Sequence, residues 1–492
     1  MRTALRKDEI LKSICQHLTR IDRGFSTLIA LARTSKSLKE TPLDVLWGTG
    51  AVSLTDALKT LPPDSWSATK DSFTLERKIT PNELFQLRQY TKRITNLQVG
   101  GGKGFETFST LIIQYGSPHL HKLWPKVEIL WWTAPSEHLH FLQFFLTPSV
   151  RNLMVNLEKS EDEVFRETLC LIESRCVHLK QLRLFDSETR ENKDLQRIIR
   201  QILSKNARTL RVFMPPQDPS APLVSDILQL PSLQELVMHV PQIPQRLPSR
   251  ILPCLRSLLF SLDHPLDILD LLHTLRKSRL INFTLNCPYP TSQADQIALA
   301  HFFRTSGLYD SLKFLVWEPP SNGSAFTWQF VTILRPFANL QALQLELNCH
   351  TACQFEFGHD DVVQISKWMP RLRELIFGGS PCPTGGTFTD IGYHTLAVVA
   401  KNCPYLYSLA VHFDIRTIGP VRWRVQPNPN VTFWDVGTTV LPSNPELRTF
   451  IALAVVKLFP KVTITGKASD QWSDISEEIE YMRLPPVHWP SG

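Results

Sequence analysis

The stretch L-Q-A-L-Q-L-E-L-N, residues 340–348, decides the fold of this chain. Leucines stand at positions i, i+3 and i+5 of the stretch, and an asparagine follows at i+8. Alternation between i+3 and i+5 is typical of a β-strand with one buried face, and residue i closes the turn that leads into the strand. The stretch therefore predicts a short strand that needs a second layer of structure on its apolar side.

The same spacing of apolar residues recurs along most of the chain. Twelve copies start at residues 94, 127, 150, 179, 210, 233, 255, 280, 312, 340, 372 and 406, at a mean period of about 28 residues. This is the pattern of leucine-rich repeats. The period leaves room for one strand and one helix, which predicts an α/β solenoid, a leucine-rich-repeat horseshoe with a parallel sheet inside and helices outside. In the copy that starts at Leu210, Pro215 occupies i+5, so this strand should be short or broken.

Apolar residues at three- and four-residue spacing predict the helices that connect the strands. Such spacing occurs in residues 163–173, 194–203, 266–275 and 389–399. Beyond residue 412 the repeat pattern weakens. There we predict a hairpin of residues 421–426 and 431–436, a helix over 446–459, a terminal strand at 462–464 and an acidic helix over 470–482.

Composition limits the classes of partner. The chain has 492 residues, with 53 Lys+Arg against 46 Asp+Glu and a formal net charge of +7. This excess is too small for a dense basic stripe, so we expect no nucleic-acid partner. No leader sequence and no apolar stretch of membrane-spanning length are found, so we expect no membrane association. The nine cysteines are irregularly spaced, unlike those of a disulfide framework, so we expect reduced thiols. Reduced thiols favour a cytoplasmic and/or nuclear location.

No recognisable motif predicts chemistry, so we expect no enzyme activity and no catalytic, cofactor-binding or metal-binding residues. The glycine-rich residues 100–104 fail as a phosphate loop because Gly104 follows Lys103 where Ser or Thr is required. A cluster of Cys349, His350, Cys353 and His359 contains possible zinc ligands. Cys349 directly follows the asparagine of the repeat turn, however, and a structural role in that turn is the preferred interpretation.

Residues 8–49 differ from the repeats and predict three short helices. They read E-I-L-x-x-I-x-x-H-L (9–18), L-x-x-L-A-R-x-S-K-S-L (28–38) and P-L-D-V-L-W (42–47). In this order and spacing the segment resembles an F-box, of the kind that precedes leucine-rich repeats in fungal proteins. The start departs from the family, because residues 6–8 are Arg-Lys-Asp where an F-box usually carries Leu-Pro.

The resemblance implies a substrate-recognition subunit of a cullin-type ubiquitin ligase, acting as a monomer within a larger complex. The F-box-like unit would bind the adaptor subunit, and the repeats would bind a protein substrate. The residues assigned to adaptor binding are Ile10, Leu11, Ile14, Leu18, Leu28, Leu46 and Trp47. The alternative is a stand-alone leucine-rich-repeat scaffold whose first helices only cap the array, since a solenoid needs a covered end.

The predicted domains follow from these features: an F-box-like unit (1–50), a connecting cap (51–90), leucine-rich repeats (91–412), an irregular hairpin with a terminal repeat (413–466) and an acidic tail (467–492).

The residue at i+4 of each repeat should point away from the buried layer, into the concave face. This column consists of Gln98, Trp131, Met154, Arg183, Met214, Val237, Leu259, Thr284, Val316, Gln344, Ile376 and Ala410. Eight of these twelve residues are apolar, which suggests that something covers them. The cover is either the C-terminal segment around residues 472–489 or a partner. The predicted substrate-binding residues are Trp131, Met154, Arg183, Met214, Val237 and Leu259.

Overall fold

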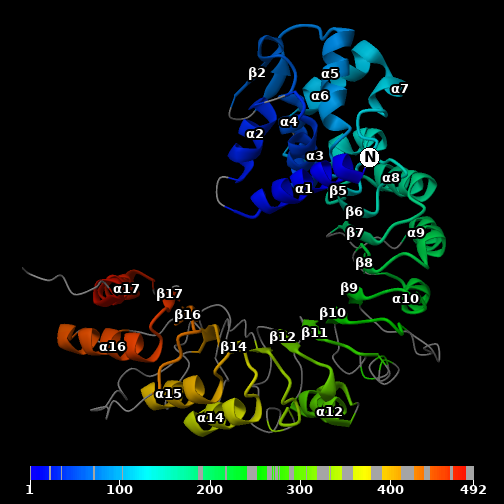
Figure 1. Cartoon of the computed structure of the whole chain (residues 1–492). Coiled ribbons are helices and arrows are strands. Elements are labelled where there is room, and N and C mark those ends of the chain that lie inside the picture. Colours follow the sequence, from blue (N-terminus) through cyan, green and yellow to red (C-terminus); the bar gives the residue numbers. More distant parts are fainter. Residues whose placement is uncertain are drawn as a thin grey trace, which may run out of the picture. The chain divides into compact units, whose positions relative to one another are not determined.

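The structure is a computed structural model, and it divides into two compact units, Met1–Leu233 and Gln234–Gly492, which are described separately (Figure 1). It describes residues 2–21, 24–34, 36–69, 72–101, 104–186, 192–216, 219–240, 252–262, 269, 271, 275, 278–286, 293–305, 307–318, 332, 334–345, 358–377, 391–411, 426–436, 441, 444–465 and 469–483.

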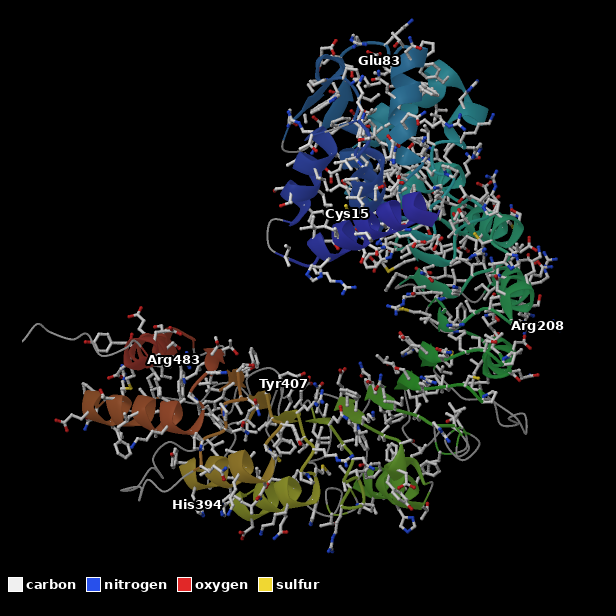
Figure 2. The ribbon with its side chains drawn as sticks, in the orientation of Figure 1. Cys15, Glu83, Arg208, His394, Tyr407 and Arg483 are labelled. Atoms are coloured by element: carbon white, nitrogen blue, oxygen red, sulfur yellow. The ribbon has the colours of Figure 1, made fainter. Side chains whose placement is uncertain are left out.

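The first unit begins with three helices, α1 (Arg2–Leu18), α2 (Gly24–Thr34) and α3 (Glu40–Thr49). One buried residue from each helix, Cys15, Leu28 and Val45, forms their common core. Figure 2 shows Cys15 on α1. Gly24 allows α2 to start against the end of α1, because a Cβ at this position would stand 1.6 Å from the Leu18 carbonyl oxygen. The three predicted helices are therefore present and pack as one small unit.

The connecting segment adds a first strand to the sheet. It contains β1 (Val52–Ser53), α4 (Leu54–Leu58), a 3-10 turn η1 (Pro63–Ser65), the antiparallel pair β2 (Trp66–Ala68) and β3 (Phe73–Leu75), and α5 (Pro81–Thr91). Val52 of β1 pairs in parallel with Leu97 of the first predicted repeat. The sheet thus starts inside the segment that the sequence predicts to be a cap, because a two-residue strand is too short to show periodicity.

The repeats of the first unit form a parallel sheet in chain order, β1-β4-β5-β6-β7-β8. Its further strands are β4 (Asn96–Gly100), β5 (Ile129–Thr133), β6 (Asn152–Asn156), β7 (Gln181–Phe185) and β8 (Val212–Met214). The return segments are α6 (Phe105–Tyr115), α7 (Ser117–Leu120), the 3-10 helix η2 (Ser136–Phe144), α8 (Asp162–Arg175), α9 (Lys193–Asn206) and α10 (Ala221–Leu228). The strand before Pro215 has three residues and is short, as predicted.

The second unit continues the same plan. Its parallel strands are β9 (Glu235–Val240), β10 (Ser257–Leu262), β11 (Asn282–Asn286), β12 (Phe314–Glu318), β13 (Ala342–Leu345), β14 (Glu374–Phe377), β15 (Ser408–Ala410), β16 (Phe433–Asp435) and β17 (Thr463–Thr465). Its helices are α12 (Gln293–Thr305), a 3-10 turn η4 (Leu308–Asp310), α14 (His359–Trp368), α15 (Tyr393–Asn402), α16 (Pro445–Leu458) and α17 (Ser469–Arg483). Figure 2 shows Tyr407 on the strand side of this unit and His394 on its helix side.

The predicted fold class is confirmed: each unit is an α/β solenoid of the leucine-rich-repeat type. The residues at i, i+3 and i+5 are buried between strands and helices, as for Leu340, Leu343 and Leu345, each with 0% exposure. Helices α8, α9 and α15–α17 match the predicted segments. Most of the helix predicted over 266–275 lies outside the described residues.

The predicted hairpin is wrong in its second half. β16 pairs in parallel with β15 on one side and with β17 on the other, through Leu409, Trp434 and Ile464. Both edges of β16 are therefore occupied, and no antiparallel partner can bind there. Val431, Trp434 and Val436 are buried at the i, i+3 and i+5 spacing, so this segment is a further repeat. Residues 421–425 are not among those described.

Candidate interaction surfaces

The three N-terminal helices expose large apolar side chains. Ile10 and Ile14 of α1 are 58% and 50% exposed. Ile21, Phe25 and Ile29 are 49%, 47% and 46% exposed. Residues four apart lie on the same helix face, which places Ile10 beside Ile14 and Phe25 beside Ile29. The unit thus has an apolar surface in addition to its core, and such surfaces mark interaction sites.

The residues assigned to adaptor binding fall into three groups. Ile10 and Ile14 are exposed, Leu28 is buried, and Leu11, Leu18, Leu46 and Trp47 are half-buried. The ring of Trp47 lies 5.7 Å from the ring of Tyr90 in α5, so this side chain contacts the chain itself. The assignment omitted Ile21, Phe25 and Ile29. The i, i+4 spacing of Phe25 and Ile29 is a signal for an apolar stripe on α2, whereas Ile21 lies between α1 and α2.

Polar contacts join α3 to the start of the repeats. Arg93, 8% exposed, donates hydrogen bonds to the carboxylates of Asp44 and Glu40. The hydrogen bond from Arg93 holds the pKa of Glu40 below its ordinary value. Thr95 Oγ1 donates to the Gly48 carbonyl oxygen at 2.6 Å. A cleft of ~450 Å³ beside these contacts is lined by side chains of both signs, including Lys12 and Asp44.

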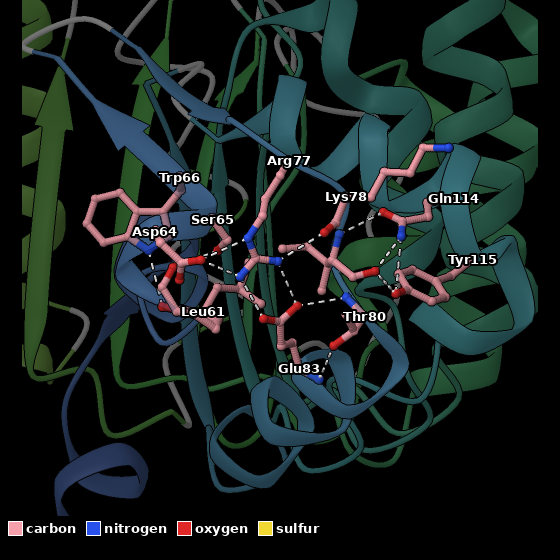
Figure 3. Close-up of polar contacts among 12 residues, drawn as sticks. Leu61, Asp64, Ser65, Trp66, Arg77, Lys78, Thr80, Glu83, Gln114 and Tyr115 are labelled. Atoms are coloured by element: carbon pink, nitrogen blue, oxygen red, sulfur yellow. Dashed lines mark hydrogen bonds and ion pairs between the residues drawn. The ribbon is translucent and has the colours of Figure 1, made fainter.

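A second polar cluster stabilises the connecting segment (Figure 3). Arg77 Nε and Nη2 donate to Asp64 Oδ2 at 2.9 and 2.8 Å, and Nη1 and Nη2 donate to the Glu83 carboxylate at 3.1 and 2.8 Å. The backbone N–H of Thr80 donates to Glu83 Oε2 at 2.7 Å, which completes the capping box of α5. The hydrogen bond from Arg77 lowers the pKa of Glu83 to about 2. Each charged group is satisfied within the cluster, which fits a structural role.

The parts of the chain that the structure describes contain no group of three potential metal ligands. Of the predicted zinc candidates, Cys349, His350 and Cys353 lie outside the described residues. His359 is hydrogen-bonded to Thr395 Oγ1 at 2.6 Å. Burial raises the pKa of Cys176 and of Cys403 to about 12, so both thiols stay protonated at neutral pH.

In the glycine-rich turn, Gly101 and Gly104 have positive φ angles of 72° and 89°, a conformation suited to glycine. Residues 102 and 103 are not described. No helix in the described segments is long and apolar enough to cross a bilayer.

The i+4 column has the predicted register within each unit. In the first unit, Gln98, Trp131, Met154, Arg183 and Met214 are successive partners on neighbouring strands. In the second unit the corresponding series is Val237, Leu259, Thr284, Val316, Gln344, Ile376 and Ala410. Trp131 is 42% exposed, and the other members are half-exposed. None of the twelve residues is buried.

The described part of the C-terminal segment lies elsewhere, which corrects the expectation that Trp472 covers the column. α17 packs chiefly against α16 and β17. Trp472 is 1% exposed, and its ring lies 6.1 Å from that of Trp434. Trp434 occupies an i+3 position on the helix side of the sheet, so Trp472 completes the core of the last repeats. Trp489 lies outside the described residues.

Comparison with protein-family models finds no match for this sequence, and comparison with curated proteins finds none. Among solved structures, the chain superposes on one from the crystal structure of the Rad7 and Elc1 complex in yeast. The superposition covers 95% of each chain, with a TM-score of 0.39 and 13% sequence identity. The fold assignment made above rests on the strand register and burial of this chain alone.

Proposed function

We propose that this protein is a substrate-recognition subunit of a cullin-type ubiquitin ligase. The three N-terminal helices bind the adaptor subunit of the ligase, and the strand faces of the repeats bind a protein substrate. The chain contributes binding surfaces and no catalytic groups. We assign adaptor contact to the exposed face that includes Ile10 and Ile14, together with Ile21, Phe25 and Ile29.

The exposed apolar side chains of α1 and α2 carry this proposal. The core of the three helices is formed by Cys15, Leu28 and Val45. Ile10 and Ile14, at 58% and 50% exposure, are not needed to complete that core. A solvent-exposed set of large apolar side chains is costly in an isolated protein and is accounted for by a partner. The resemblance of residues 9–47 to an F-box supports a ligase adaptor as that partner.

Co-purification tests the proposal. The tagged full-length chain should capture the adaptor and the cullin from cells, and Ile10→Asp/Ile14→Asp should abolish this capture because two carboxylates would be desolvated in the interface. The matched control is Ser13→Asp/Gln16→Asp, which adds the same charge at other exposed positions of α1. Capture that survives in the isoleucine variant, or that never occurs with the wild-type chain, would overturn the proposal.

A stand-alone repeat scaffold is the second candidate, and the contacts of α3 favour it. Arg93 binds Asp44 and Glu40, and Trp47 contacts Tyr90, as expected for a cap fixed to the first repeat. In that case neither double variant changes the set of captured proteins. Removal of the cap contacts by Arg93→Gln would then lower the free energy of unfolding without affecting any ligase association.

A further inference from the structure

The turns that precede the strands of the first unit are rich in cations. Counted together with the last residues of α8 and α9, the turns before β5–β8 comprise residues 121–128, 145–151, 174–180 and 206–211. They contain seven lysines and arginines, which are Lys122, Lys126, Arg151, Arg175, Lys180, Arg208 and Arg211. Glu128 is the one carboxylate among them. The edge of the sheet at which these strands begin is therefore positively charged, whereas the chain as a whole is nearly balanced.

The backbone brings three of these cations to adjacent positions. The N–H of Arg151 donates to the carbonyl of Glu128 at 2.8 Å, that of Lys180 to Arg151 at 2.6 Å, and that of Arg211 to Lys180 at 2.7 Å. Neighbouring strands lie about 4.8 Å apart, so the three cationic residues follow one another at this interval. Lys180 and Arg211 are exposed, and Arg151 is half-exposed. We call Arg151, Lys180 and Arg211 the basic edge.

The strand register places one carboxylate beside the basic edge, that of the exposed Glu128, next to Arg151. Within the described residues, none of its three members forms an ion pair. The helix side of the same repeats differs, because four of its cations are paired with carboxylates: Arg166 with Glu163, Arg197 with Asp194, Arg200 with Asp226, and Lys205 with Glu173. Like charges on adjacent strands destabilise a sheet. An anionic partner would relieve this repulsion.

The strand face beside the basic edge is apolar and lacks anions. Strands β4–β8 contain no Asp or Glu, and their one charged residue is Arg183. Trp131, Met154 and Met214 are accessible on this face. Met154 and Met214 lie three residues along the strand from Arg151 and Arg211, which corresponds to about 10 Å, whereas the residue at this distance from Trp131 is Glu128. A ligand that spans both features needs apolar groups and acidic groups at this separation.

We propose that the first unit binds an acidic segment of a protein substrate, with its carboxylates on Lys180 and Arg211 and its apolar side chains on Trp131 and Met154. This inference rests on the proposed function, because it names the chemistry of the substrate that the repeats hold. A protein segment fits better than a single-stranded nucleic acid. Nucleic acids require successive exposed aromatic rings for base stacking, and Trp131 is the exposed aromatic residue of β4–β8.

Binding of short synthetic peptides to the full-length chain tests the inference. The probes are an array of peptides that combine Glu with Leu or Phe in varied orders, and a second array in which Gln replaces each Glu. We expect the Glu peptides to bind and the Gln peptides not to bind, with affinity that falls as salt is raised. Lys180→Gln/Arg211→Gln should weaken the tightest peptides about tenfold. Arg166→Gln/Arg197→Gln, which removes two charges from the helix side, should leave them unchanged.

Several outcomes would overturn the inference: equal binding of both arrays, unchanged affinity in the Lys180/Arg211 variant, or preferential binding of phosphoserine peptides or of oligothymidine. Thermal unfolding of each variant excludes loss of fold as the cause. A second variant, Trp131→Ser, should weaken binding without changing its salt dependence, because it removes an apolar contact alone. No ligase component is present in this assay. Failure of peptide binding is therefore distinguishable from failure of adaptor capture, which tests the proposed function.

Discussion

Leu345 and Gln344 are neighbours in β13 with opposite environments. Leu345 has 0% exposure between sheet and helices, whereas Gln344 is half-exposed and its Nε2 donates to Glu374 Oε2 at 2.8 Å. Leu345→Asp should lower the free energy of unfolding by about 3–5 kcal/mol, because it places a carboxyl group without a partner in the core. Gln344→Thr should lower the free energy of unfolding by less than about 1 kcal/mol, because it removes one exposed hydrogen bond.

Urea unfolding of both variants measures this difference. Gln344→Thr is preferred over Gln344→Asp as the control, since an aspartate would stand next to the carboxylate of Glu374. Equal losses of stability in the two variants would mean that the strand register is wrong.

Glu83 links stability to pH. The hydrogen bond from Arg77 lowers the pKa of Glu83 from 4.5 to about 2 in the folded chain. Between these values the unfolded chain binds more protons, so the contribution of Glu83 is complete above pH 4.5 and is lost as pH falls toward 2. Thermal midpoints of Glu83→Gln should therefore lie below the wild-type values at neutral pH and approach them in acid. Glu106→Gln, at an exposed position at the start of α6, is the control for the loss of one carboxylate.

At the scale of the element, α17 closes the end of the second unit. Trp472, Ile475 and Ile479 have exposures of 1%, 0% and 2%, so one face of the helix is buried against the last repeats. Trp472→Ala should cost about 3–5 kcal/mol and increase the binding of an apolar dye, because the indole leaves a cavity beside Trp434. Tyr481→Ala changes a side chain with 76% exposure in the same helix and is the control. Dye binding that rises equally in both variants would contradict the role of α17 as an end cap.

The repeat elements were predictable because one rule governs them: residues at i+3 and i+5 share a face in any strand. Burial of Leu97 and Leu130 followed directly from that spacing. β1 is not predictable in this way, because a strand of two residues is too short to show an alternation of buried and exposed side chains. The sequence of β16 predicts half of a hairpin, because Trp434 stands where leucine is usual and a Pro-Asn turn precedes the strand.

The surfaces were only partly predictable. Helical spacing identified Ile10 and Ile14 as members of an apolar set, but the burial of Cys15 depends on how α1 packs against α2 and α3. The lysines and arginines at i+1 of successive repeats were visible in the sequence. Only the register of the strands, however, places Lys180 beside Arg211 and shows that no carboxylate lies between them.

At the scale of the whole molecule, the two proposed binding functions reside on different elements and should be separable. Ile10→Asp/Ile14→Asp should lose adaptor capture and keep peptide binding, and Lys180→Gln/Arg211→Gln should do the opposite. All four side chains are exposed, and Ile14 is 50% exposed. Their substitution should therefore leave the core intact, and the thermal midpoints of the variants should stay close to that of the wild type. The combined variant should show both losses at their individual magnitudes, because the two pairs lie on different elements of the unit. If either pair alone abolished both activities, one surface would serve both partners, and adaptor and substrate would compete for it rather than be joined by this chain.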